Sequence, residues 1–127
     1  AYERQPLRGP GELWRVAEVL GALEREPFAA VELPALAERA HMSVNNFLRI
    51  FRTATGYSPI DYVLRLRVRR AADLLRATTF NITEIAGQVG FADSNYFSRQ
   101  FRRILGQSPR DYRKAFMTGA RLGGQLE

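Results

Sequence analysis

The chain contains one pattern of residues twice, and this duplication limits its fold more than any other feature of the sequence. In both copies two phenylalanines four residues apart precede a glycine, a Ser-Pro pair and an Asp-Tyr pair. The first copy comprises Phe47, Phe51, Gly56, Ser58, Pro59, Asp61 and Tyr62, and the second comprises Phe97, Phe101, Gly106, Ser108, Pro109, Asp111 and Tyr112. Identity at seven positions with one offset (47 against 97) indicates a structural repeat.

The repeat continues upstream with a slightly different offset. The apolar positions of the first copy are Leu33, Leu36, Ala37 and Ala40, and those of the second are Ile82, Ile85, Ala86 and Val89. These lie 49 residues apart (33 against 82), so the second copy has one more residue before its phenylalanines. Because turns tolerate insertions and helices do not, we predict a turn at this place in each copy.

Each copy therefore predicts a helix-turn-helix unit, in which two short helices are joined by a tight turn. The first pair covers residues 34–40 and 43–55, and the second covers 81–89 and 93–105. The expected N-terminal caps are Ser43, Asn81 with Glu84 in a capping box, and Asp93. Gly56 and Gly106 are expected to end the longer helices.

Three further helices complete an all-α prediction. Leu13, Val16, Ala17, Leu20 and Leu23, broadened by Trp14 and Val19, predict an amphipathic helix over 12–25. Ser58-Pro59 and Ser108-Pro109 open helices over 59–77 and 109–117. The first of these has apolar residues on two sides and is expected to pack on both repeats. The predicted organisation is a linker (1–11), a first helix-turn-helix subdomain (12–57), a linker helix (58–78), a second subdomain (79–117) and a flexible tail (118–127).

The composition favours a partner that carries phosphate. The net charge is +6, and Lys114 is the one basic residue that is not arginine. Guanidinium groups bind phosphates and base edges with two parallel hydrogen bonds. The chain has no cysteine, so thiolate chemistry is excluded. Its single histidine is His41, so a Ser-His-Asp triad would have to use this residue, which lies between two predicted helices. We expect no enzyme activity, no cofactor and no metal site.

No run of about twenty apolar residues predicts a membrane span. We expect a cytoplasmic, nucleoid-associated protein without a membrane partner. The chain begins with Ala1, and residues 1–11 contain two prolines and two glycines. This composition favours a linker that belongs to a longer protein.

The second helix of a helix-turn-helix unit is the one that enters the major groove of DNA. With Phe47, Ile50 and Phe51 buried, the outward positions of the first copy are Val44, Asn45, Leu48, Arg49 and Arg52. With Phe97, Phe101 and Ile104 buried, those of the second are Ser94, Asn95, Ser98, Arg99 and Arg102. Both copies thus present Asn-x-x-x-Arg, and asparagine with adenine and arginine with guanine are favoured pairings. Leu48 either contacts a thymine methyl group or is partly buried.

Helix starts and nearby arginines are the expected phosphate contacts. Backbone N–H groups at a helix N-terminus bind anions. The predicted phosphate-binding residues are Ser43, Arg52, Arg102, Arg103 and Arg110.

The chain resembles the DNA-binding domain of AraC/XylS-type transcription regulators over residues 12–117. The most specific stretch contains Arg67, Ala71, Leu74, Leu75, Ile82, Ile85, Ala86, Val89, Gly90, Phe91, Asp93, Tyr96, Phe97, Ser98, Arg99, Phe101, Gly106, Ser108, Pro109, Tyr112 and Arg113. The resemblance implies about seven helices in a homeodomain-like tandem of two helix-turn-helix units joined by a long helix. It also implies sequence-specific binding to a double-stranded operator, usually by a bacterial activator.

Carried over by position, the resemblance implies base contacts by Asn45, Asn46, Leu48, Arg49, Ser94, Asn95, Ser98 and Arg99. The sequence departs from the family at Leu48 and in the combination Val44-Asn45-Asn46, so the operator cannot be taken from a relative. Family members usually carry an effector-binding or dimerisation domain, which we expect N-terminal to this segment, and we expect RNA polymerase as a partner. Two reading helices on one chain are expected to enter successive major grooves.

Two other functions fit this sequence less well than DNA reading. A basic helical protein-interaction module would bind DNA only non-specifically, and it gives no reason for Asn-x-x-x-Arg in both copies. A DNA-repair enzyme that transfers alkyl groups needs a thiolate, which this sequence lacks.

Overall fold

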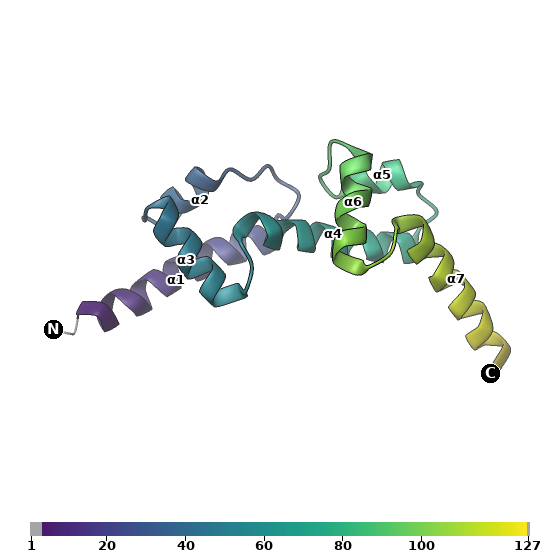
Figure 1. The fold of residues 1–127 in the computed structure, drawn as a ribbon, viewed down its shortest axis with the longest axis horizontal. Coiled ribbons are helices and arrows are strands. Elements are labelled where there is room, and N and C mark those ends of the chain that lie inside the picture. Colours follow the sequence, from purple (N-terminus) through teal and green to yellow (C-terminus); the bar gives the residue numbers. More distant parts are fainter. Residues whose placement is uncertain (1–3, 127) are drawn as a thin grey trace. The chain divides into compact units, whose positions relative to one another are not determined.

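A computed structural model describes the backbone of residues 4–126 and the side chains of residues 11–119. Within the described backbone the fold consists of helices and contains no strand, which confirms the all-α prediction (Figure 1). The helices are α1 (Arg4–Arg25), α2 (Leu33–Arg39), α3 (Val44–Thr55), α4 (Pro59–Ala77), α5 (Ile82–Gln88), α6 (Ser94–Leu105) and α7 (Pro109–Leu126).

The chain divides into two compact units, Ala1–Val63 and Leu64–Glu127. The boundary falls inside α4, so the predicted linker helix is shared between them. Val63 of α4 is buried in the first unit, whereas Val68 and Leu75 are buried in the second. The apolar residues on different sides of α4 therefore belong to two separate cores.

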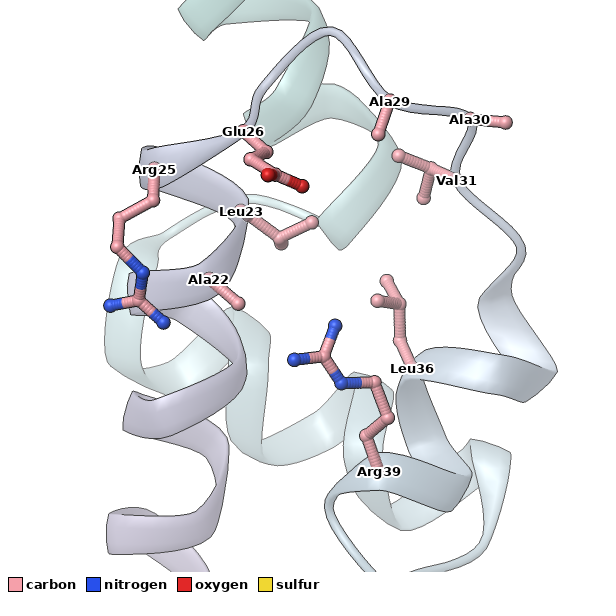
Figure 2. Close-up of a pocket in the computed structure, with 9 residues that line it drawn as sticks. All are labelled: Ala22, Leu23, Arg25, Glu26, Ala29, Ala30, Val31, Leu36 and Arg39. Carbon is pink, nitrogen blue, oxygen red and sulfur yellow. The ribbon is translucent and has the colours of Figure 1, made fainter.

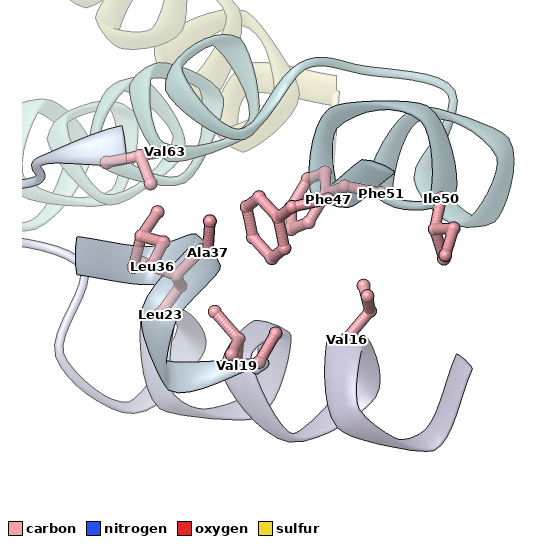
Figure 3. Packing of buried hydrophobic residues seen from close by; sticks show 10 residues of the cluster. Val16, Val19, Leu23, Leu36, Ala37, Phe47, Ile50, Phe51 and Val63 are labelled. Carbon is pink, nitrogen blue, oxygen red and sulfur yellow. The ribbon is translucent and has the colours of Figure 1, made fainter. Parts of the chain in front are cut away.

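The core of the first unit is built from α1, α2, α3 and the start of α4 (Figure 3). Its buried members are Val16, Val19, Leu23, Leu36, Ala37, Ala40, Phe47, Ile50, Phe51 and Val63. The buried stripe of α1 is narrower than the sequence predicted, since Leu13 and Trp14 are 51% and 63% exposed. Trp14 lies nearly opposite Val16 and Val19 on a wheel of about 100° per residue, which explains its exposure.

The second unit repeats this core on α4, α5 and α6. Its buried members are Val68, Ala71, Ala72, Leu75, Ile85, Ala86, Val89, Phe91, Phe97 and Phe101. In both units the second phenylalanine meets a tyrosine edge to face. The ring centroids of Phe51 and Tyr62 are 5.7 Å apart, and those of Phe101 and Tyr112 are 5.5 Å apart. Such edge-to-face contacts add to the free energy that the rings gain by burial. The shared sequence pattern therefore produces the same aromatic packing in both units.

The predicted helix caps are confirmed. The Ser43 side chain accepts a hydrogen bond from the backbone N–H of Asn46 at 3.1 Å. Asn81 and Glu84 form a reciprocal capping box, and the Asp93 side chain caps α6. Gly56 and Gly106 end α3 and α6 in the left-handed conformation, with φ of 86° and 84°. The side chains of Ser58 and Ser108 accept from the backbone N–H groups of Asp61 and Asp111.

The turns between the paired helices differ by one residue, as the change of offset predicts. Residues 40–43 separate α2 from α3, and residues 89–93 separate α5 from α6. At equivalent places His41 has φ of 57° and Gly90 has φ of 94°. Both turns close on the first helix, because Met42 N–H donates to the Ala37 carbonyl and Phe91 N–H donates to the Ala86 carbonyl. The first turn thus places an L-residue in a conformation that favours glycine.

Two predicted helix ends are wrong. The first helix begins at Arg4, not near residue 12, and the last helix continues to Leu126, not to about residue 117. The glycines expected to end α7 cost a helix only about 1 kcal/mol each. α1 also contains Pro10 in its interior, which costs a helix about 3 kcal/mol, and no contact of the described side chains explains why the helix continues through it. Residues 1–3 of the predicted linker and residue 127 of the predicted tail lie outside the described residues.

His41→Gly should raise the free energy of unfolding by about 0.5–1 kcal/mol, because it relieves a left-handed conformation at an exposed residue. Gly90→Ala should lower this free energy by about 1 kcal/mol or more for the opposite reason. Urea unfolding followed by circular dichroism measures both effects.

Gly87→Ala is the matched control for this pair. Gly87 lies in α5 without a left-handed φ, and a Cβ there meets no atom within 4 Å. This variant should therefore gain about 0.5 kcal/mol. Loss of stability in both glycine variants would contradict the assignment of strain to the turn.

Candidate nucleic-acid interface

The second helix of each unit turns a polar, basic surface outward because its phenylalanines face the core. On α3 the exposed residues of this surface include Asn45, Arg49 and Arg52. On α6 they include Asn95, Arg99, Arg102 and Arg103. The asparagine and the first arginine lie four residues apart, so they share one side of the helix.

The predicted base-contacting residues fall into two groups of exposure. Asn45, Arg49, Asn95 and Arg99 are exposed, whereas Asn46, Leu48, Ser94 and Ser98 are half-buried. Leu48 is the one apolar member of this set.

Val44 was predicted to point away from the core, and this prediction is wrong. It is half-buried and packs against the core of the first unit. The reason is its position three residues before Phe47, which places both side chains on the same side of α3. Ile104, expected to be buried, is half-buried and packs against the second core.

In the first unit Arg49 belongs to a chain of hydrogen bonds. The Asn46 side-chain Nδ2 donates to Glu12 Oε2 of α1 at 2.8 Å. The Oδ1 atom of the same amide accepts a hydrogen bond from Arg49 Nη2. The guanidinium of the first unit is therefore linked to α1 through Asn46.

In the second unit the equivalent arginine is held by an aromatic ring. The Arg99 guanidinium carbon lies 5.8 Å from the centroid of the Tyr96 ring, which is within the range of a cation-π interaction. Tyr96 in turn lies against Phe91, with ring centroids 5.9 Å apart. The two units thus hold equivalent arginines by different means.

The predicted phosphate-binding residues surround these helices. Ser43 caps α3, and the side chains of Arg52, Arg102, Arg103 and Arg110 are exposed. Arg103 Nε also donates to Gln100 Oε1 at 2.8 Å. Arg110 is the second residue of α7, next to the helix start capped by Ser108.

Two arginines brace the turns in front of α3 and α6, a role that was not predicted from the sequence: Arg67 was named only as part of the family signature, and Arg15 was not singled out. Arg15 Nε donates to the Ala40 carbonyl at 2.7 Å, and Arg67 Nη1 donates to the Gly90 carbonyl at 3.3 Å. Arg67 also lies 5.9 Å from the centre of the Phe91 ring. Burial lowers the pKa of the Arg67 guanidinium, and the nearby Tyr96 acts in the opposite direction.

These two arginines carry a signal that was present in the sequence. Aligning α1 with α4 by their buried valines, Val16 and Val68, gives an offset of 52 residues (16 against 68). Arg15 and Arg67 then correspond (15 against 67). The repeat therefore extends into the helix that precedes each helix-turn-helix, with a third offset.

A pocket in the first unit lies apart from the predicted site residues. It has a volume of about 420 Å³ and is lined by α1, α2 and the segment between them. Figure 2 shows Arg39 of α2 pointing toward α1 across this space. None of the predicted base-contacting or phosphate-binding residues lines it.

Among the described residues no group of three histidine, cysteine or acidic side chains is placed to hold a metal ion. Likewise, none of the described helices is long and apolar enough to cross a membrane.

Comparisons with known proteins agree with this architecture. A family model described as a helix-turn-helix domain matches residues 36–115. The transcriptional activator RhaS of Escherichia fergusonii is 40% identical over 100 residues, which cover 79% of this chain and 36% of that protein. RhaS of Yersinia pestis is 37% identical over 109 residues, which cover 86% of this chain and 40% of that protein. The chain thus spans well under half the length of these relatives.

Among solved structures, the DNA-binding domain of the global transcriptional factor AdpA, determined in complex with a target DNA, has a TM-score of 0.76 and 35% identity. The match covers 81% of this chain and 93% of that one. A transcriptional regulator with an AraC-type DNA-binding domain from Chromobacterium violaceum has a TM-score of 0.70 and 25% identity, and the match covers 90% and 95% of the two chains.

Two helix-turn-helix units, each with an exposed basic second helix, define a tandem DNA-binding domain. The chain belongs to the AraC/XylS family of transcription regulators, as its family match and its structural neighbours show.

Arg15→Met should lower the free energy of unfolding by about 1–2 kcal/mol, because the carbonyl of buried Ala40 loses a charged donor while the aliphatic packing is kept. Arg25→Met, at an exposed position on the same helix, is the control and should change this free energy by less than about 0.5 kcal/mol. Urea unfolding measures both. Equal effects of the two variants would show that the turn does not depend on Arg15.

Proposed function

We propose that this chain is the DNA-binding part of a bacterial transcription activator and that it recognises a specific duplex sequence with α3 and α6. The observation that carries the proposal is the same exposed Asn-x-x-x-Arg arrangement on both helices, at Asn45 and Arg49 and at Asn95 and Arg99. Similarity to a domain determined on its target DNA supports it.

The proposed base contacts follow from the chemistry of the major groove. Arg49 and Arg99 are suited to guanine, and Asn45 and Asn95 to adenine. The shorter hydroxyls of Ser94 and Ser98 are proposed to contact either base edges or bridging water, and Leu48 is proposed to contact a thymine methyl group. Asn46 lies at the edge of this surface.

Contacts to the DNA backbone are proposed for Ser43, Arg52, Arg102, Arg103 and Arg110. They supply affinity that does not depend on sequence and that falls with salt concentration. The two reading helices are proposed to enter successive major grooves of one site.

The remaining partners belong to the whole protein. Its relatives are activators of more than twice this length. We propose that the full protein carries an effector-binding or dimerisation domain N-terminal to this segment, contacts RNA polymerase and acts at the nucleoid in the cytoplasm.

Selection from a random duplex library, followed by fluorescence-anisotropy titration, tests the function directly. We expect one site spanning two adjacent major grooves, bound more than about a hundredfold more tightly than a scrambled duplex at physiological salt. Equal binding to both duplexes, lost steeply as salt rises, would favour the basic protein-interaction module instead.

Arg99→Ala should cost about 1–3 kcal/mol of binding free energy on the selected site and relax the preference at one base pair. Arg103→Ala should weaken binding to all sequences alike. It should also make the slope of log K against log salt concentration shallower by about one, the contribution of one phosphate contact. Anisotropy titrations of single-base-pair variants at several salt concentrations separate the two effects. Arg25→Ala, which changes the charge of α1 only, is the control; the assignment of Arg99 to base reading fails if Arg99→Ala behaves like Arg103→Ala.

A further inference from the structure

We propose that Glu12 on α1 is a positioning residue for DNA reading by the first unit. It fixes the side-chain amide of Asn46, and this amide fixes the guanidinium of Arg49. The inference rests on the proposed function, because it concerns how Arg49 meets a base pair. It also gives Asn46 a different role from direct base contact.

The hydrogen bonds select a single orientation of the Asn46 amide. A carboxylate only accepts hydrogen bonds and a guanidinium only donates them. Asn46 therefore directs its Nδ2 toward Glu12, at 2.8 Å from Oε2, and its Oδ1 toward Arg49. Turning the amide over would set donor against donor and acceptor against acceptor. Glu12 thus determines which end of the amide faces the reading arginine.

Both ends of the Asn46 amide are engaged within the protein. Contact with an adenine edge uses both its oxygen and its nitrogen. The two N–H groups of Nδ2 already have acceptors, Glu12 Oε2 at 2.8 Å and Met42 Sδ at 4.0 Å, so such a contact would require one of these bonds to break. Arg49 is exposed and gives one of its five N–H donors to Asn46, whereas a guanine needs only two. The division of roles that follows is that Arg49 reads the base and Asn46 holds Arg49 in place.

The second unit supplies an internal comparison. Asn46 and Arg49 correspond to Tyr96 and Arg99, fifty residues later (46 against 96). Glu12 corresponds to Leu64 by the offset that relates Val16 to Val68. There the arginine lies over an aromatic ring, and an apolar residue takes the place of the acid.

This comparison supports a positional role for Glu12. The first unit has Glu12, Asn46 and Arg49 at these three positions. The second unit has Leu64, Tyr96 and Arg99 at the equivalent positions. In each case the second residue holds the third. A carboxylate close to a DNA-facing surface repels phosphate, so Glu12 lowers non-specific affinity while it orders the reading arginine. Removing it should therefore change specific and non-specific binding in opposite directions.

The test compares Glu12→Leu, which copies the second unit, with Glu12→Gln, which keeps an acceptor but removes the charge. Base preferences are measured for each protein by selection from the random duplex library, and the base pair assigned to Arg49 is identified from the profile of Arg49→Ala. Glu12→Leu should reduce discrimination at that base pair by about fivefold, the scale of one hydrogen bond. Base pairs read by α6 should keep their preferences.

Glu12→Gln should retain most of the discrimination, since its amide oxygen can still accept from Asn46. Both variants should bind a scrambled duplex more tightly than the original chain, because each removes one negative charge. Asn46→Ala should reproduce the loss seen with Glu12→Leu, and combining the two should add nothing further.

Three results would overturn the inference. The first is an unchanged profile at the Arg49 base pair in Glu12→Leu. The second is an equal loss in Glu12→Leu and Glu12→Gln, which would indicate an effect of charge alone. The third is a loss spread over base pairs of both units, which would indicate general damage to the fold. If the unaltered chain binds operator and scramble alike, the proposed function itself fails, and this outcome is distinct from the three.

Discussion

Burial of two phenylalanines one helical turn apart is the interaction on which the other features of each unit depend. Phe47 and Phe51 fill the first core, and Phe97 and Phe101 fill the second. Each of these rings is fully buried, so rotation of the helix about its axis would expose a large apolar surface, worth roughly 2–3 kcal/mol for one ring. The aromatic pair therefore fixes which residues of α3 and α6 face outward. The outward-facing surface of each helix is thus a consequence of the core.

The features that the sequence predicted correctly are those with local signals. Helix caps such as Ser43 and Asn81 are recognisable because the cap and its partner lie within three residues. The one-residue difference between the turns followed from two offsets in the numbering. The placement of Asn45 and Arg49 on the outer face followed from helical periodicity alone. Their contact with DNA stays a prediction, because no element of the structure tests it.

What the sequence analysis missed depends on contacts between distant residues. Arg15 and Ala40 are 25 residues apart, and Glu12 and Asn46 are 34 apart. No periodicity within one helix indicates that such side chains meet. The end of α7 was misplaced for another reason, since glycines do not by themselves stop a helix. Val44 was the avoidable error, because its spacing from Phe47 already placed it toward the core.

The division of α4 between the units has a consequence for attempts to express them separately. The helix starts at Ser58 and Pro59 in the first unit, while most of its buried residues, from Val68 to Leu75, serve the second. A fragment that ends at Val63 would keep only the first turn of this helix, which is too short to persist without further packing. A fragment that begins at Leu64 would lack the residues that start it. Neither compact half is therefore expected to fold when it is expressed alone. An exchange of halves between relatives has to keep the whole of α4 from one parent.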